Sequence, residues 1–128
     1  MSDSRKILII EDDKQLLEFY NSIKETLDEN VDCTIASNGD EGVLALNESV
    51  FDAIILDLVM PGTDGYAVLD YLKDCELNQN TMVTVLTNLD TQEDRIKTKA
   101  LGVRNYYVKS DLTNSGIKDI LNGNAPLV

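Results

Sequence analysis

The sequence predicts an α/β fold with a five-stranded parallel sheet and helices on both faces. Two observations predict it: short apolar runs alternate along the chain with patterns of helical spacing, and the clearest runs are continuously apolar. Continuous apolar runs are typical of strands that are buried on both faces, and alternation of strand and helix is typical of parallel sheets. The 128 residues fit a single domain, with a core over about 5–121.

The apolar runs are the predicted strands. The first of them, KILII, and the third, DAIILDL, are the most apolar stretches of the chain. The five runs occupy residues 6–10, 33–37, 52–58, 82–87 and 105–109. Each is short and bounded by polar or turn-forming residues, which favours a strand over a helix.

Helical patterns fill the intervals between and after these runs. They occupy residues 13–30, 38–49, 66–77, 91–102 and 114–121. Asp13 is a suitable N-cap for the first helix. Thr91 and Asp94 form a capping-box pattern at the start of the fourth, which Gly102 ends. Residues 122–128 have no periodicity, so we expect a loose tail there.

Composition excludes several classes of function. The formal net charge of −12 argues against a nucleic-acid binder and against an anionic membrane surface. The chain has no histidine, and Cys33 and Cys75 lack CxxC spacing, so a zinc site or a histidine-assisted nucleophile is not expected. No apolar segment has the length of a signal peptide or membrane span. We therefore expect a cytoplasmic protein with free thiols.

Polar residues follow four of the predicted strands. Because the carboxyl ends of parallel strands meet at one edge of a sheet, we expect these residues to converge if the first strand lies between the second and third. In chain order they are Glu11, Asp12 and Asp13, then Asp57, then Thr87 with Asn88, then Lys109.

The expected pocket has the chemistry of phosphoryl transfer. Clustered carboxylates repel one another, so they must bind a cation or stay partly protonated. Oxygen ligands without Cys or His suit Mg²⁺ or Mn²⁺. Lys109 and Thr87 could bind phosphoryl oxygens, and Asp57 could be a nucleophile that forms an aspartyl phosphate. Each residue alone has an ordinary structural explanation, but their coincidence at four strand ends favours this chemistry.

These residues carry a resemblance to a known family. The stretches IIEDD at 9–13, IILDLVMPGTDG at 54–65, VLTN at 85–88 and NYYVKS at 105–110 resemble, in order and spacing, those of response-regulator receiver domains of the chemotaxis-regulator type. The resemblance covers about residues 5–121. It implies the flavodoxin-like strand order 2-1-3-4-5 and a role in two-component signalling.

The resemblance implies a phosphoacceptor and a metal site. Asp57 would accept a phosphoryl group from the phosphohistidine of a sensor histidine kinase or histidine phosphotransfer protein. Asp13 and Asp57 would bind Mg²⁺ directly, together with the backbone carbonyl of Val59. Asp12 would act mainly through a metal-bound water.

The resemblance also implies a switch. Lys109 would contact a phosphoryl oxygen, and Thr87 would move inward to bind another. Tyr106 matches the family's switch aromatic, which rotates inward with the threonine, although a half-buried sheet aromatic is the alternative explanation. The surface of the fourth helix, fifth strand and fifth helix would then bind a downstream target or output domain.

The chain departs from the family pattern near the site. Ser110 follows the lysine, where the family usually has a proline after a cis peptide bond, so the geometry of this bond is left open. Asn88 stands where Ala or Gly is usual. Val59 and Leu89 are apolar and could not orient an attacking water. We therefore expect Val59, Asn88 and Leu89 to control the phosphoryl lifetime, and self-dephosphorylation to be slow.

Other classes fit less well. A phosphatase similar to the haloacid dehalogenases needs a second acid two residues after its nucleophile, where this chain has Val59. A dinucleotide-binding fold would show GxGxxG after the first strand, which is absent. A receiver-like interaction module that is never phosphorylated stays the alternative. The sequence leaves open whether the chain stands alone or belongs to a longer protein.

Overall fold

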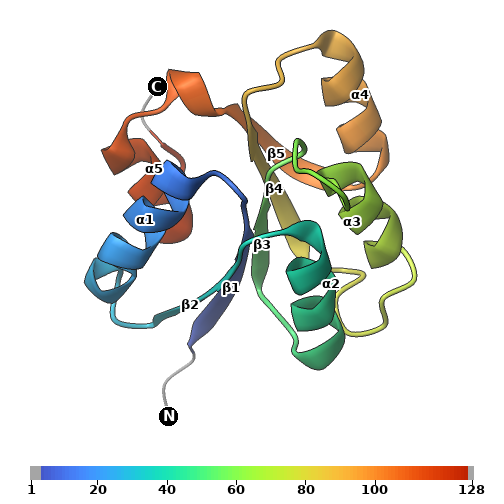
Figure 1. Ribbon diagram of the computed structural model, residues 1–128. Helices are drawn as coiled ribbons and strands as arrows, with labels where there is room; N and C mark the ends of the chain where they lie inside the picture. Colours follow the sequence, from blue (N-terminus) through green and yellow to red (C-terminus); the bar gives the residue numbers. More distant parts are fainter. Residues whose placement is uncertain (1–3, 127–128) are drawn as a thin grey trace.

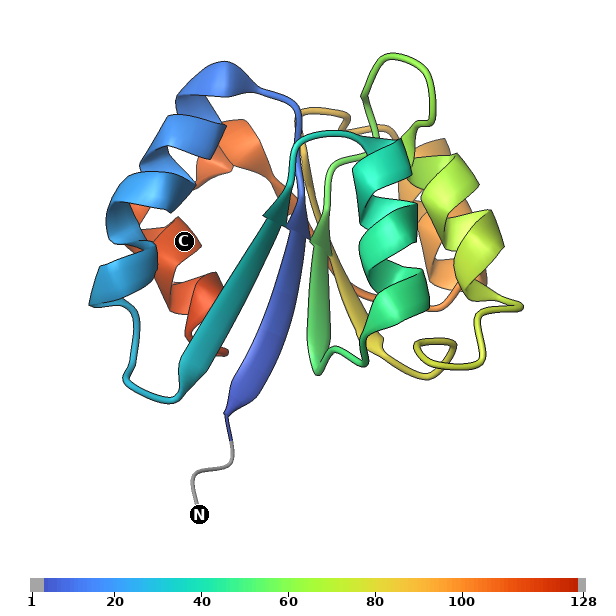
Figure 2. The same ribbon diagram turned by 60° about the horizontal axis from the view of Figure 1, so that its bottom comes forward.

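The five predicted strands form one parallel sheet in the order β2-β1-β3-β4-β5. The computed structural model describes residues 4–126. Figures 1 and 2 show the sheet in the middle of the molecule, with helices on both sides. The strands are β1 (Arg5–Ile10), β2 (Val31–Ala36), β3 (Ala53–Leu56), β4 (Met82–Thr87) and β5 (Val103–Val108). The predicted fold class and strand order are confirmed.

The helices divide between the two faces of the sheet. In Figure 1, α1 and α5 cover one face, and α2, α3 and α4 cover the other. Their bounds are α1 (Lys14–Ile23), α2 (Gly39–Glu48), α3 (Gly65–Leu72), α4 (Gln92–Ala100) and α5 (Asn114–Leu121). Two short 3₁₀ turns, Lys24–Thr26 and Lys109–Asp111, follow α1 and β5.

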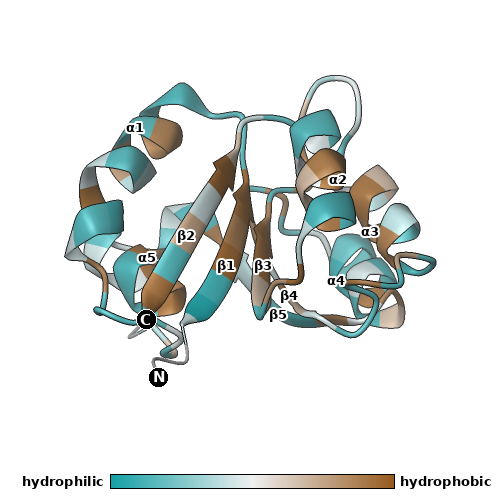
Figure 3. Cartoon of the chain, turned by 90° about the horizontal axis from the view of Figure 1, so that it is seen from below, coloured by the Kyte–Doolittle hydropathy of each residue, from teal (hydrophilic) through white to brown (hydrophobic). Residues whose placement is uncertain are grey.

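Alternation along the central strands builds two separate cores. Ile7 and Ile9 pack with α1 and α5, whereas Leu8 and Ile10 pack with α2 and α3. All four side chains are fully buried, which explains the continuous apolar run. In Figure 3 the hydrophobic colour is concentrated on β1 and β3 in the middle of the molecule, whereas the helices carry both hydrophobic and hydrophilic residues.

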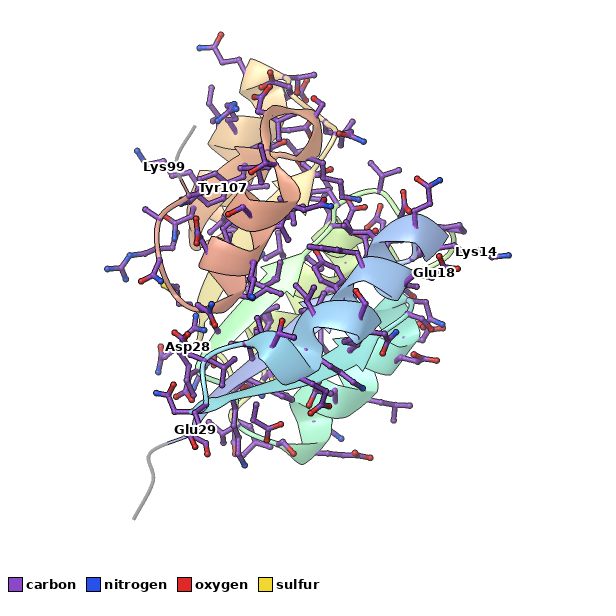
Figure 4. All side chains as sticks on the ribbon, turned by 90° about the vertical axis from the view of Figure 1, so that its left-hand side faces the viewer. Lys14, Glu18, Asp28, Glu29, Lys99 and Tyr107 are labelled. Atoms are coloured by element: carbon purple, nitrogen blue, oxygen red, sulfur yellow. The ribbon has the colours of Figure 1, made fainter. Side chains whose placement is uncertain are left out.

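The outer surface carries the charge of the chain. In Figure 4, Lys14 and Glu18 extend from α1, and Asp28 and Glu29 lie at the opposite end of this side of the molecule. All four are exposed, as expected for charged residues without a buried partner. Within residues 4–126, no helix is both long enough and apolar enough to span a membrane.

The register of β1 and β3 positions the carboxyl edge. Ile10 pairs with Leu56, and the Asp57 N–H donates to the Ile10 carbonyl at 3.1 Å. Glu11 and Asp57 therefore leave neighbouring strands side by side. Since side chains alternate along a strand, both lie on the face that carries Ile9 and Ile55.

Helix α3 ends at Leu72, five residues before the predicted end. Buried Asn78 stabilises the chain that follows. Its side-chain amide donates to the carbonyls of Leu46 (2.8 Å) and Ser49 (2.7 Å), and its Oδ1 accepts from the Phe51 N–H (2.8 Å). These bonds hold residues 73–81 as turns against the α2–β3 connection. Apolar periodicity could not reveal this tertiary constraint.

The first helix is also shorter than predicted. It ends at Ile23, and one 3₁₀ turn continues it to Thr26. In the predicted tail, the Asn122 side chain accepts from the Asp28 N–H at 2.9 Å, and Pro126 is buried. Asn122 and Pro126 are therefore held against the fold. Residues 127–128 lie outside the described part of the chain.

Candidate functional site

A pocket of about 340 Å³ opens at the carboxyl edge of the sheet. In Figure 2 this edge lies opposite the N-terminus, where the arrowheads of the strands end. The pocket is lined by Asp12, Asp13, Asp57, Val59, Asn88, Leu89 and Lys109. The sequence analysis singled out all seven, and the structure brings them together.

Lys109 joins two buried carboxylates across the sheet. Its Nζ lies 2.8 Å from Asp57 Oδ2 and 2.9 Å from Glu11 Oε1. The side chains of Glu11 and Asp57 are only 2% and 5% exposed, and that of Lys109 is 13% exposed. Burial lowers the pKa of Lys109, but the hydrogen bonds to Asp57 and Glu11 outweigh it and raise the pKa overall. The ammonium is therefore charged at neutral pH.

Glu11 is the site residue to which the sequence analysis assigned no role. Its second oxygen, Oε2, accepts from the N–H groups of Asp12 (3.1 Å) and Asp13 (3.0 Å). Strand alternation could have revealed it, because Glu11 follows Ile7 and Ile9 on the same face. The side chain is thus held between Lys109 and the start of the loop that leads to α1.

Burial raises the pKa of Glu11 to about 7, although the bond to Lys109 opposes the shift. The folded, metal-free chain therefore holds a proton on Glu11 more tightly than the unfolded chain does. By linkage, this group favours folding most at low pH, and its contribution is lost as pH rises from 4.5 through about 7. A bound cation would favour the charged form of Glu11 and so offset this loss of stability at higher pH.

Three carboxylates gather closely enough to share a cation. Glu11, Asp12 and Asp57 each offer an oxygen within 4.8 Å of the other two. Asp13 is not in this group. Its Oδ1 instead accepts from the Leu16 N–H at 3.1 Å and caps α1, as the sequence also suggested. The third carboxylate of this group is Glu11, whereas Asp13, which the sequence analysis expected as a direct ligand, lines the same pocket outside the group.

A glycine holds the loop after Asp57 close to the strand. The Gly65 N–H donates to the Leu58 carbonyl at 3.0 Å. A Cβ at Gly65 would lie 2.4 Å from the Asp57 carbonyl oxygen, so only glycine fits there. The Val59 N–H donates to Asp57 Oδ1 at 3.2 Å. Both oxygens of Asp57 thus have donors, and the side chain has one fixed orientation.

The two predicted switch residues meet at Leu89. The Thr87 hydroxyl, fully buried, accepts from the Leu89 N–H at 3.3 Å, and the Tyr106 hydroxyl donates to the Leu89 carbonyl at 2.6 Å. The Arg95 guanidinium lies 4.7 Å from the centre of the Tyr106 ring. The loop between β4 and α4 is therefore held by both residues at Leu89.

The Lys109–Ser110 peptide bond is trans, since the described residues contain no cis peptide bond. Lys109 begins the 3₁₀ turn that ends at Asp111, and the Leu112 N–H closes it by donating to the Lys109 carbonyl at 3.1 Å. The question that the sequence left open at Ser110 is thus answered.

We predict that Lys109→Met lowers the free energy of unfolding by about 3 kcal/mol at pH 7.5, because Glu11 and Asp57 lose their buried counter-charge. The loss should be smaller at pH 5, where Glu11 is protonated. Urea denaturation at both pH values measures it. Lys73→Met is the control, since Lys73 pairs with Asp70 on the surface at 3.3 Å and should change stability by less than about 0.5 kcal/mol. Equal effects of the two substitutions would contradict the prediction.

Comparison with known proteins agrees with this geometry. A family model described as the response regulator receiver domain matches residues 7–120, which include the whole pocket. The transcriptional regulatory protein CiaR of Streptococcus pneumoniae is 34% identical over 104 residues, which make up 81% of this chain and 44% of CiaR. The chain thus spans less than half the length of this relative.

Two solved structures have the same fold. The phosphorylated cyanobacterial phytochrome response regulator RcpA is 27% identical, with a TM-score of 0.76 over 94% of this chain and 90% of that one. The Mn²⁺-bound form of the response regulator Rcp1 is 26% identical, with a TM-score of 0.77 over 93% and 90%. The matched family consists of signalling receivers that phosphorylation activates. This chain belongs to the family of response regulator receiver domains.

Proposed function

We propose that this chain accepts a phosphoryl group on Asp57 from the phosphohistidine of a sensor histidine kinase or a histidine phosphotransfer protein. The observation that carries the proposal is the buried contact of Asp57 with Lys109 beside two further carboxylates. An Asp57 oxygen attacks phosphorus, the bond from phosphorus to the donor imidazole breaks, and an aspartyl phosphate forms. The chain itself has no histidine, which agrees with a donor on a partner.

Lys109 can stay paired with negatively charged oxygens before and after this step. Before transfer its ammonium binds Asp57 and Glu11. After transfer one Asp57 oxygen is bonded to phosphorus, and the Lys109 ammonium can bind a phosphoryl oxygen instead while Glu11 still binds Lys109. The rigid placement of a cation where negative charge develops is the main contribution that a protein makes to phosphoryl transfer.

The acidic group fits a divalent cation, Mg²⁺ or Mn²⁺. Asp12 and Asp57 are the proposed direct ligands, because the Asp12 carboxylate has no hydrogen-bond partner within residues 4–126. Glu11 is buried and, unlike Asp12 and Asp57, does not line the pocket, so it supports the site from behind. The Val59 carbonyl stays a predicted third ligand. When bound, a divalent cation would supply neutralisation of the negative charge that gathers at this site.

The chain would then act as a switch that assists its own phosphorylation rather than as a turnover enzyme. Its output is a changed surface on α4, β5 and α5, which a downstream protein or output domain would bind. Thr87 and Tyr106 would transmit the change, because both bind the backbone of Leu89 at the pocket wall. A cytoplasmic location is part of the proposal, and the free thiols Cys33 and Cys75 suit a reducing compartment.

The direct test is incubation with Mg²⁺ and acetyl phosphate or phosphoramidate, followed by intact mass measurement. We expect one phosphoryl adduct, lost in Asp57→Asn and retained in Asp52→Asn, which changes an aspartate at the other end of the same strand. An adduct that survives Asp57→Asn would contradict the assignment of the acceptor. If no donor, including a histidine kinase, modifies the chain, the interaction module becomes the better reading.

A second prediction separates the two candidate metal ligands. Asp12→Asn should weaken Mg²⁺ binding by roughly tenfold or more, because it removes a proposed ligand charge. Asp13→Asn should bind Mg²⁺ within about threefold of the parent, because Asn caps a helix as well as Asp does. Titration calorimetry measures both affinities. The reverse order would restore Asp13 as the ligand that the sequence analysis expected.

A third prediction concerns the lifetime of the phosphoryl group. Val59 is 55% exposed and Leu89 lines the pocket, and neither can orient a water, so we expect slow hydrolysis. Val59→Asn should shorten the lifetime by supplying a polar group, whereas the control Val50→Asn, at an equally exposed valine, should not. Loss of the adduct is followed by mass after the donor is removed. A parent half-life of only seconds would refute slow hydrolysis.

A further inference from the structure

Helix α4 buries little of its surface. Thr98 is its one buried residue, and the Thr98 hydroxyl bonds only to carbonyls of the same helix. Ile96, the large apolar residue in mid-helix, is 61% exposed. The position of α4 must therefore depend strongly on the side chains that reach it from neighbouring elements.

Tyr66, on the first turn of α3, makes such a contact. Its hydroxyl donates to Asp94 Oδ1 in the first turn of α4, at 2.5 Å. The Lys97 ammonium also lies 5.1 Å from the centre of the Tyr66 ring. Burial and this hydrogen bond both raise the pKa of Tyr66. The hydrogen bonds from Thr91 and Tyr66 lower the pKa of Asp94. Two different attractions thus join α3 to α4 through one side chain.

The same carboxylate continues the contact toward the pocket. Asp94 Oδ2 accepts from the Thr91 hydroxyl at 2.6 Å. In return, the Asp94 N–H donates to the Thr91 hydroxyl oxygen at 3.0 Å. Thr91 is the N-cap of α4 and ends the loop of residues 88–91. Asn88 and Leu89 in this loop line the phosphorylation pocket. A rigid path therefore runs from Tyr66 to the pocket wall.

We propose that Tyr66 is a positioning residue for phosphoryl chemistry at Asp57. By binding Asp94 it fixes the first turn of α4, and with it the loop of residues 88–91 that walls the pocket. This inference rests on the proposed function. The loop is tied to the sheet at Leu89 by Thr87 and Tyr106, and to α4 by the ion pair of Arg95 with Asp90 at 3.0 Å. Within the described part of the chain, it is tied to α3 only by Tyr66 through Asp94. Loss of the tie to α3 gives water easier access to the phosphoryl group.

The first measurement needs no phosphorylation. Tyr66→Phe keeps the ring and removes only the hydroxyl. Amide hydrogen exchange over residues 92–98 should become roughly threefold to tenfold faster, the effect of one hydrogen bond of ordinary strength. Tyr71→Phe is the matched control, because Tyr71 lies on the same helix and its hydroxyl bonds to Asn47 instead, at 3.2 Å. Unchanged exchange in Tyr66→Phe would overturn the contact as a determinant of α4.

The second measurement is the phosphoryl lifetime. Tyr66→Phe should lose the adduct roughly twofold to fivefold faster than the parent, with Tyr71→Phe unchanged. Asp94→Ala, which also removes the acceptor of Thr91, should act in the same direction, and the double variant should be no faster than Asp94→Ala alone, because Tyr66 acts through Asp94. Faster exchange with an unchanged lifetime would overturn the positioning role. A parent chain that takes up no phosphoryl group would instead refute the proposed function, while the exchange data would still judge the contact.

Discussion

The ion pairs of Lys109 with Glu11 and Asp57 are the interaction on which the site depends. Two carboxylates and one ammonium, all nearly buried, meet where β1, β3 and β5 end. Burial of charge is costly, and a buried ion pair often stabilises a protein no better than apolar residues would. An apolar cluster at this edge would suit the fold equally well. The charged side chains therefore serve the chemistry of the site rather than the stability of the fold.

The charge of this cluster is also incomplete. Lys109 supplies one positive charge, whereas Glu11, Asp12 and Asp57 can supply three negative ones. Burial is the main cause of the raised pKa of Glu11, and the nearby charge of Asp57 adds to it. A divalent cation would balance the excess negative charge, and a phosphoryl group would compete for Lys109. The same electrostatic need would account for the proposed cation binding and for a response to phosphorylation.

The response can spread because the wall of the pocket is lightly held. Leu89 is held at its N–H by Thr87 and at its carbonyl by Tyr106. Helix α4, which follows, has little buried surface. Two arrangements of such a region can differ by only a few kcal/mol, so one modification can shift their populations.

Most of the fold could be predicted because the chain is locally consistent. Continuous apolar runs marked the strands, and capping residues such as Asp13 and Thr91 marked helix starts. The end of α3 could not be predicted, since it depends on Asn78 bonding to residues about thirty positions away. The membership of Glu11 in the carboxylate group could not be read from the sequence with the same ease, because Glu11 still follows the alternation of β1 whereas Asp13 has left the strand and caps α1.

The central claim is that these carboxylates hold a cation and that the pocket then receives a phosphoryl group. Two-dimensional NMR of the ¹⁵N-labelled chain tests it most directly, first with Mg²⁺ and then with beryllium fluoride, a phosphoryl analogue. We expect Mg²⁺ to shift the signals of residues 11–13 and 57–59. Beryllium fluoride should extend the shifts to residues 87–91 and α4. Shifts that avoid the carboxyl edge, or an analogue response that needs no Mg²⁺, would contradict the account.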